Sequence, residues 1–188
     1  MGTSSGSWIP SKWRCDGGQP GALSDSDVGM ATYSLTTLWY LEAPISRVFD
    51  TLGEVPLWPD WWPGLLAVEE RDAGKDDGTG RVYHYTWQSR LGYRLCFDMR
   101  VIRVVRPWLI EGAASGDVCG VGRWRISEQA GVTRVCHEWQ VRTTRPWMNL
   151  VAPLARPLFV WSHHAVMRDG AEGLARRLGV RLLDLAHL

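Results

Sequence analysis

The sequence predicts an α+β fold in which a curved antiparallel sheet of about seven strands wraps around one long C-terminal helix. Two observations support this prediction. Apolar and polar residues alternate with a period of two through most of residues 31–144, as in strands that have one face in water. From about Leu158 to Leu178 the apolar residues recur at helical spacing instead. A sheet that is apolar on one face needs a cover, and the helix is the candidate.

The first elements follow from proline and apolar spacing. We expect a strand over residues 33–42, which Pro44 ends because proline has no donor for a sheet ladder. Pro44 suits the first turn of a short helix over residues 45–53, with Gly53 as its stop. The inward face of the strand is expected to carry Tyr33, Leu35, Thr37, Trp39 and Leu41, and the apolar side of the helix Val48, Phe49 and Leu52.

The next segment, PLWPDWWPG at residues 56–64, holds three tryptophans and three prolines. Proline breaks helices and central strands, so we expect at most a turn or a short broken helix. Tryptophan combines a large apolar face with one N–H donor, which suits the wall of a pocket. We therefore expect Trp58, Trp61 and Trp62 to form a wall of a pocket for an apolar ligand, with at least one facing the cavity and at least one only packing.

Six further strands and the long helix complete the order. The prolines at 153 and 157 predict that the helix is broken or begins late, and Gly170 and Gly173 weaken it by roughly 1 kcal/mol each. Residues 181–188 either continue the helix or dock separately. Turn signals at 74–80, 91–92 and 131 separate several of the strands, which are expected at 65–72, 81–90, 93–105, 108–117, 120–128 and 133–144.

Composition excludes some classes of partner. The formal net charge of +1 and the pI of about 7.7 give no electrostatic case for a nucleic-acid partner. No apolar run has the length of a membrane span, so we expect no stable membrane insertion. Residues 1–29 are rich in glycine and serine and are expected to be a flexible tail, with residues 30–188 as a single domain. We expect no cofactor, and the sequence leaves both a monomer and a homodimer open.

The cysteines favour a reducing compartment. The four residues Cys15, Cys96, Cys119 and Cys136 form no CxxC pair. We interpret them as free thiols, which predicts a cytoplasmic location. Metal binding needs three or four converging ligands, and His163 and His164 point about 100° apart on a helix, so no metal site is predicted.

Six stretches of the sequence match a known family: Ala43-Pro44, Val48-Phe49-Asp50, the segment from Trp58 to Gly64, Gly120 to Trp124, Thr133 to Trp139 and His164 to Leu174. They resemble the START-like superfamily (SRPBCC), within it the polyketide cyclase/dehydrase and lipid-transport group. The resemblance spans about Ala31 to Leu178. It implies the helix-grip fold, with two short helices after the first strand and a cavity between the sheet and the C-terminal helix. The family shares a shape rather than one chemistry, so no catalytic motif is carried over.

Alternation identifies the side chains that should face this cavity. His137 and His164 are candidates for acid–base chemistry because imidazole titrates near neutral pH, with Tyr83 and Tyr85 as hydroxyl partners. For each histidine, a structural role is the more common explanation. The expected ligand-binding residues are Trp58, Trp61, Trp62, Trp87, Tyr93, Phe97, Met99, Trp124, Trp139 and Met167.

Three functions remain open at this stage. The first is binding of a small apolar molecule, either aromatic and polyketide-like or lipid-like, in the internal cavity. The second is an enzyme of the polyketide cyclase or dehydratase type that uses the His and Tyr groups. The third is a protein-partner module of the same fold. The few polar groups in a largely apolar pocket favour the first.

Overall fold

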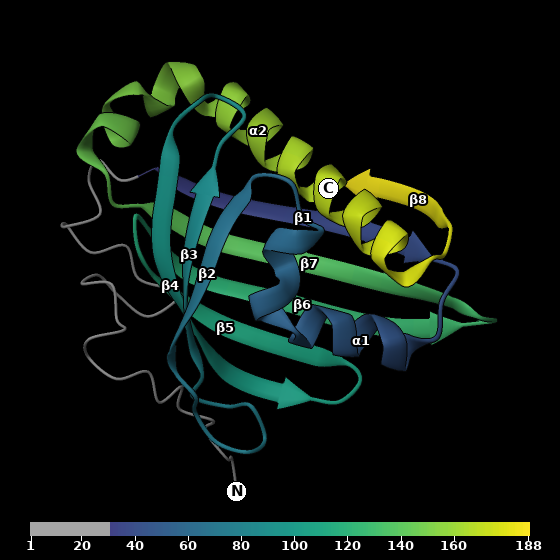
Figure 1. Ribbon diagram of the computed structural model, residues 1–188. Helices are drawn as coiled ribbons and strands as arrows, with labels where there is room; N and C mark the ends of the chain where they lie inside the picture. Colours follow the sequence, from purple (N-terminus) through teal and green to yellow (C-terminus); the bar gives the residue numbers. More distant parts are fainter. Residues whose placement is uncertain (1–30) are drawn as a thin grey trace, which may run out of the picture.

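The computed structural model describes residues 31–188, with the backbone alone described for residues 146–153 and 155. The predicted tail, residues 1–29, lies outside this part. Figure 1 shows one large sheet with two helices of different length beside it. In chain order the elements are β1 (Thr32–Leu41), α1 (Ile45–Gly53), the 3-10 helix η3 (Val55–Asp60), β2 (Leu65–Asp72), β3 (Val82–Gln88), β4 (Arg94–Val105), β5 (Leu109–Gly116), β6 (Val118–Gln129), β7 (Val132–Thr143), α2 (Pro146–Leu178) and β8 (Leu182–His187).

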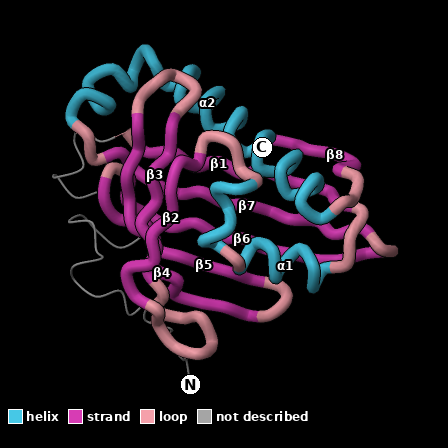
Figure 2. Tube along the Cα trace, in the orientation of Figure 1, coloured by secondary structure: helices cyan, strands magenta, loops and turns pink. Residues whose placement is uncertain are grey.

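The sheet is antiparallel throughout. Its strand order is β2-β3-β4-β5-β6-β7-β1-β8, and every neighbouring pair runs in opposite directions. Helices α1, η3 and α2 all lie against one side of it (Figure 2). The predicted α+β helix-grip architecture is therefore confirmed, with one strand more than expected. The extra strand is β8, in which residues 182–187 pair with β1 beside the end of α2.

Helix α2 begins earlier than predicted. It starts at Pro146 and runs without interruption through residues 153 and 157 to Leu178. Proline removes one hydrogen bond and bends a helix, which need not end it. Figure 1 shows the first, green third of α2 at an angle to the rest. Gly179, at φ 67°, ends the helix in the left-handed conformation that glycine adopts without strain.

The two short helices are where the sequence places them. Helix α1 buries Val48, Phe49 and Leu52, as its apolar spacing predicts. The PLWPDWWPG segment forms η3, a short 3-10 helix that contains Pro59. Gly53 is the last residue of α1 and has an ordinary helical conformation, and Glu54 follows it as the cap, so the predicted stop falls one residue later.

The cysteines differ from the prediction at one position. Cys96 and Cys136 are free, but Cys119 is disulfide-bonded. Cys15 lies outside the described residues. Since disulfides are rare in a reducing compartment, Cys119 weakens the ground on which a cytoplasmic location was predicted.

Candidate functional site

A cavity of about 660 Å³ lies between the concave face of the sheet and helix α2. This volume is within the usual range for small-molecule sites. The walls come from β1 and β3 to β7 on the sheet side, and from α1, η3 and α2 opposite. Twelve aromatic side chains line it: Tyr33, Phe49, Trp58, Trp62, Tyr83, Tyr85, Trp87, Tyr93, Phe97, Trp124, Trp139 and Phe159.

Most of the residues expected at the cavity lie in its wall. Of the predicted set, all but Trp61 and His164 are lining residues. The strand positions follow the alternation, because Tyr83, Tyr85 and Trp87 share the inward face of β3. Whether these side chains bind a ligand stays a prediction at this point, since position alone does not demonstrate contact.

The three tryptophans of residues 56–64, Trp58 within η3 and Trp61 and Trp62 after it, divide between two roles. Trp58 and Trp62 line the cavity, whereas Trp61 stacks on Trp62 at a centroid distance of 5.4 Å and lies outside the wall. The indole N–H of Trp62 donates to the carbonyl of Val166 in α2 at 2.8 Å. This bond fixes the orientation of the Trp62 ring at the cavity.

Two glycines of α2 make this packing possible. A Cβ at Gly170 would overlap the Trp62 ring, and one at Gly173 would overlap the backbone carbonyl of Trp61. The glycines weaken α2 as a helix, and they let Trp61 and Trp62, which follow η3, lie directly against it. The segment PLWPDWWPG is thus a rigid wall, held by prolines within and by two glycines across the interface.

His137 lies in the cavity without a hydrogen-bond partner for its Nδ1 atom among the described residues. Its ring is 4.1 Å from that of Trp124, centroid to centroid. Burial away from water disfavours the charged form and lowers the pKa of His137 to about 3. The imidazole is therefore neutral near pH 7.

His163, rather than His164, is the second histidine of the cavity wall. Successive helical residues point about 100° apart, so the two cannot share a direction. Burial lowers the pKa of His163 well below its ordinary value, and His137, His164 and His187 lower it further. The Nδ1 atom of His163 also lacks a hydrogen-bond partner among the described residues.

His164 instead faces the C-terminal strand β8. Its ring stacks on His187 at 3.9 Å, and His187 Nδ1 lies 3.1 Å from the hydroxyl of Thr37. Burial is the main cause of the lowered pKa of both rings; that of His187 falls to about 4. The four histidines therefore form a row from the cavity to the β8 edge, all of them neutral near pH 7.

The tyrosines add hydroxyl groups to the cavity. Burial raises the pKa of Tyr33, Tyr85 and Tyr93, so none of the three ionises near neutral pH. The hydroxyl of Tyr33 has no hydrogen-bond partner among the described residues, and the hydroxyl of Tyr83 lies 3.5 Å from the Arg81 guanidinium. The cavity therefore offers neutral donors and acceptors on an aromatic wall.

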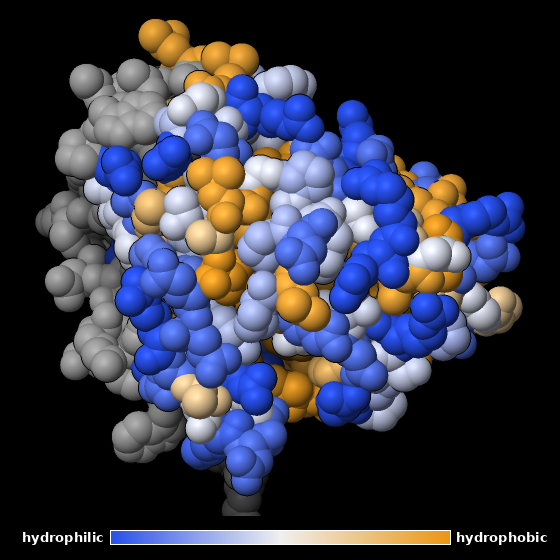
Figure 3. Space-filling view, in the orientation of Figure 1, coloured by the Kyte–Doolittle hydropathy of each residue, from blue (hydrophilic) through white to orange (hydrophobic). Residues whose placement is uncertain are grey.

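The mouth of the cavity is marked by its exposed lining residues. All six come from the end of α1 with the cap that follows, from the β2–β3 loop, or from the β4–β5 turn. Figure 3 shows orange, apolar surface set between blue residues on this side of the molecule. The six are Asp50, Gly53, Glu54, Asp76, Asp77 and Arg106.

The sequence contained a pattern that could have identified His163, but none that could have identified the mouth residues. The α2 residues in the wall are Phe159, Ser162, His163, Val166 and Met167, which is the apolar spacing of one helix face. Counting four residues back from Met167 gives His163, so this signal was present in the sequence. The mouth residues carried no such pattern, because they come together only through the fold.

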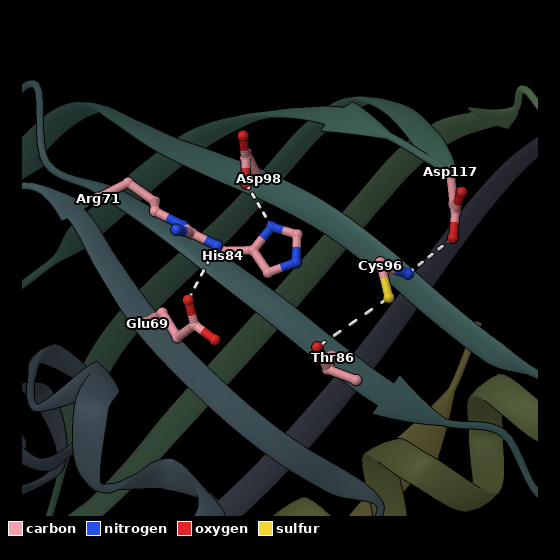
Figure 4. Close-up of polar contacts among 7 residues, drawn as sticks. All are labelled: Glu69, Arg71, His84, Thr86, Cys96, Asp98 and Asp117. Atoms are coloured by element: carbon pink, nitrogen blue, oxygen red, sulfur yellow. Dashed lines mark hydrogen bonds and ion pairs between the residues drawn. The ribbon is translucent and has the colours of Figure 1, made fainter.

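The opposite, convex face of the sheet carries a separate set of polar contacts (Figure 4). His84 and Asp98 are cross-strand partners, with His84 Nδ1 2.6 Å from the Asp98 carboxylate. The backbone N–H of Cys96 donates to Asp117 at 2.7 Å. None of these residues lines the cavity. Among the described residues, no group of three or more His, Cys, Asp or Glu is placed to hold a metal ion, and no helix is long and apolar enough to cross a membrane.

The fold is similar to that of several solved structures. The di-domain ARO/CYC BexL from the BE-7585A biosynthetic pathway is similar over 80% of this chain and 51% of its own, with a TM-score of 0.63 and 17% identity. The Zhui aromatase/cyclase from Streptomyces sp. R1128 is similar over 79% of this chain and 96% of its own, with a TM-score of 0.60 and 16% identity. A START superfamily protein from Mycobacterium smegmatis gives a TM-score of 0.61 and 13% identity over 80% of this chain and 97% of its own.

These likenesses establish the fold, which this chain shares with the aromatase/cyclase and START superfamily structures. This chain spans about half the length of the two di-domain proteins that it resembles. No protein-family model matches the sequence. No curated protein matches it either.

Proposed function

We propose that this protein binds a small aromatic molecule in the cavity between the sheet and α2. The observation that carries the proposal is the wall itself, in which twelve aromatic rings surround about 660 Å³. Aromatic rings attract one another in offset and edge-to-face geometries, so such a wall favours a flat aromatic ligand. His137, His163 and the tyrosines of the wall supply the few polar groups that orient a ligand in an apolar site.

A second candidate is a cyclase or dehydratase that works in the same cavity. It is supported by the presence of two imidazoles and several tyrosine hydroxyls there, and by the fold shared with proteins named aromatase/cyclase. A general base works best when its pKa lies near the operating pH. The pKa of His137 is about 3, which makes it a weak base in the free protein. Binding is therefore the better supported function.

The test is a titration with a three-ring phenol, phenanthrol, followed by quenching of tryptophan fluorescence. Val101 lines the cavity on β4, so Val101→Phe should fill part of it and weaken binding about tenfold or more. Ile102, the next residue, is not a lining residue, and Ile102→Phe is the matched control. Equal binding by wild type and Val101→Phe would contradict the proposal.

The enzyme candidate has its own outcome. If a polyketone substrate is turned over, His137→Ala should abolish turnover while phenanthrol binding persists. A carrier would show no turnover, and because His137 is one of the groups that orient the ligand, His137→Ala should weaken phenanthrol binding by about tenfold at most.

A further inference from the structure

We propose that the cavity selects uncharged aromatic ligands and excludes carboxylates and phosphates, so that fatty acids and phospholipids are not its cargo. This inference deepens the proposed function and rests on it. It separates the two ligand classes, aromatic and lipid-like, that the sequence leaves open.

The first ground is the distribution of charge along the wall. Six charged residues line the cavity, and five of them belong to the mouth or its flanking loop: Asp50, Glu54, Asp76, Asp77 and Arg106. The sixth, Arg81, directly precedes β3 at the end of the same β2–β3 loop. The remaining lining residues that the structure describes are apolar, aromatic or neutral and polar. A buried anion would therefore meet no cation beyond the mouth.

The second ground is that both arginines of the wall already have partners. Arg106 forms an ion pair with Asp50. The Nε–H of Arg81 donates to the carbonyl of Ala73 at 3.2 Å, and its Nη1 lies near the Tyr83 hydroxyl. Arg156 lies over the Tyr33 ring at 5.9 Å, but it is exposed and not part of the wall. Capture of a ligand anion by these arginines would compete with existing contacts.

The third ground is the net charge of the residues at the mouth, which is negative. The mouth carries four carboxylates against the two arginines, Arg81 and Arg106, so the entrance has an excess of negative charge. A ligand carboxylate left at the entrance would meet like charges, which weakens binding and slows association. A carboxylate carried inside would lose its hydration without a counter-ion, which costs several kcal/mol. Neither position suits an anion.

The fourth ground is what the interior offers instead. His137 Nδ1, His163 Nδ1 and the Tyr33 hydroxyl have no hydrogen-bond partner among the described residues. These three atoms are enclosed by protein, and the side chains that carry them line the cavity as neutral groups. Both imidazoles are neutral near pH 7, and a neutral imidazole can donate to a ketone or accept from a phenol. The matching ligand is an aromatic phenol or ketone without ionised groups.

The experiment compares two probes of the same shape at neutral pH: phenanthrol, which is uncharged, and phenanthrene carboxylate, which is ionised. The full chain is titrated with each, and dissociation constants are measured by tryptophan quenching. We expect the carboxylate to bind at least about a hundredfold more weakly. A carboxylate affinity within about threefold of the phenol would overturn the charge selection and leave the proposed function standing. Binding of neither probe would overturn the proposed function itself.

A variant makes the test independent of ring preference. Gln88 lines the cavity and is half-buried, so Gln88→Arg should bring a guanidinium to the wall. A charge-assisted hydrogen bond to the carboxylate should then reduce the ratio of the two dissociation constants, carboxylate over phenanthrol, by about tenfold. Gln88→Met has a similar length without charge and should leave this ratio unchanged. Retained phenanthrol binding shows that each variant is folded, and an unchanged ratio in Gln88→Arg counts against the inference.

Discussion

His84 and His137 occupy the same sheet but opposite faces, and their surroundings differ in every respect. On the convex face His84 lies 2.6 Å from the Asp98 carboxylate, with partial exposure to water. On the concave face His137 is buried against Trp124, and its Nδ1 has no partner among the described residues. The strand period of two sends alternate residues to these two environments.

The contrast extends to the charges of each face. On the convex side Arg123 lies 3.2 Å from Glu111, and Arg125 lies 3.0 Å from Glu138, so the charged groups satisfy one another. On the concave side the polar groups are few and neutral: Ser89 and Ser162 bond to each other, whereas His137 Nδ1 has no partner among the described residues. We conclude that charges balance one another on the convex face and are absent from the inner wall of the concave one.

The largest effect is expected from separating α2 from Trp61 and Trp62, the two residues that follow η3, which would open the concave side. Gly173→Ala places a Cβ against the backbone carbonyl of Trp61, and backbone cannot rotate away. We expect a loss of about 3 kcal/mol in the free energy of unfolding, measured by denaturant titration. Gly53→Ala is the matched control, because Gly53 is helical and its Cβ would meet nothing within 4 Å. It should stabilise by up to about 1 kcal/mol. Equal stabilities of the two variants would contradict the close packing.

The second effect is acid sensitivity that originates on the concave face. The folded pKa of His137, about 3, lies below its unfolded value near 6.5, so the unfolded chain binds the proton first. Its contribution to stability is complete above about pH 6.5 and is lost as the pH falls toward 3, at up to about 1.4 kcal/mol per pH unit. His163, His164 and His187 act in the same direction.

The measurement is the free energy of unfolding from about pH 7 to about pH 4. His137→Phe should flatten this dependence relative to wild type, since it removes one of the protons taken up on unfolding. If the wild-type free energy stays constant over this range, the histidine row is not buried in its neutral form.

The smallest effect is expected on the convex face. Asp98→Asn removes the carboxylate that faces His84, at a position where both side chains reach water. Exposed ion pairs contribute about 0–1 kcal/mol, so the free energy of unfolding should fall by no more than about 1 kcal/mol. Phenanthrol affinity should not change. A large loss of phenanthrol binding in this variant would show that the two faces are coupled, and would contradict the independence of the convex and concave faces.

Sequence alone predicted most of the fold and the sheet half of the cavity. Alternation placed Tyr83, Tyr85 and Trp139 correctly because strand periodicity is local. The helical stripe on α2 put His164 at the cavity, where the structure has His163, because neighbouring residues of a helix point about 100° apart. The acidic mouth and strand β8 depend on contacts between distant segments, which no local pattern reports.

The most direct test of the account is the position of a bound aromatic ligand. Met99 on β4 and Met167 on α2 lie in opposite walls of the cavity, so their methyl groups report on both sides of it. The protein is labelled at the methionine methyl carbons and titrated with phenanthrol in an NMR experiment. If the ligand binds in the cavity, both signals should shift through ring currents and saturate together, and Val101→Phe should need about tenfold more phenanthrol, or more, to reach the same shifts. Saturable binding that leaves both signals unmoved would place the ligand elsewhere and contradict the central claim.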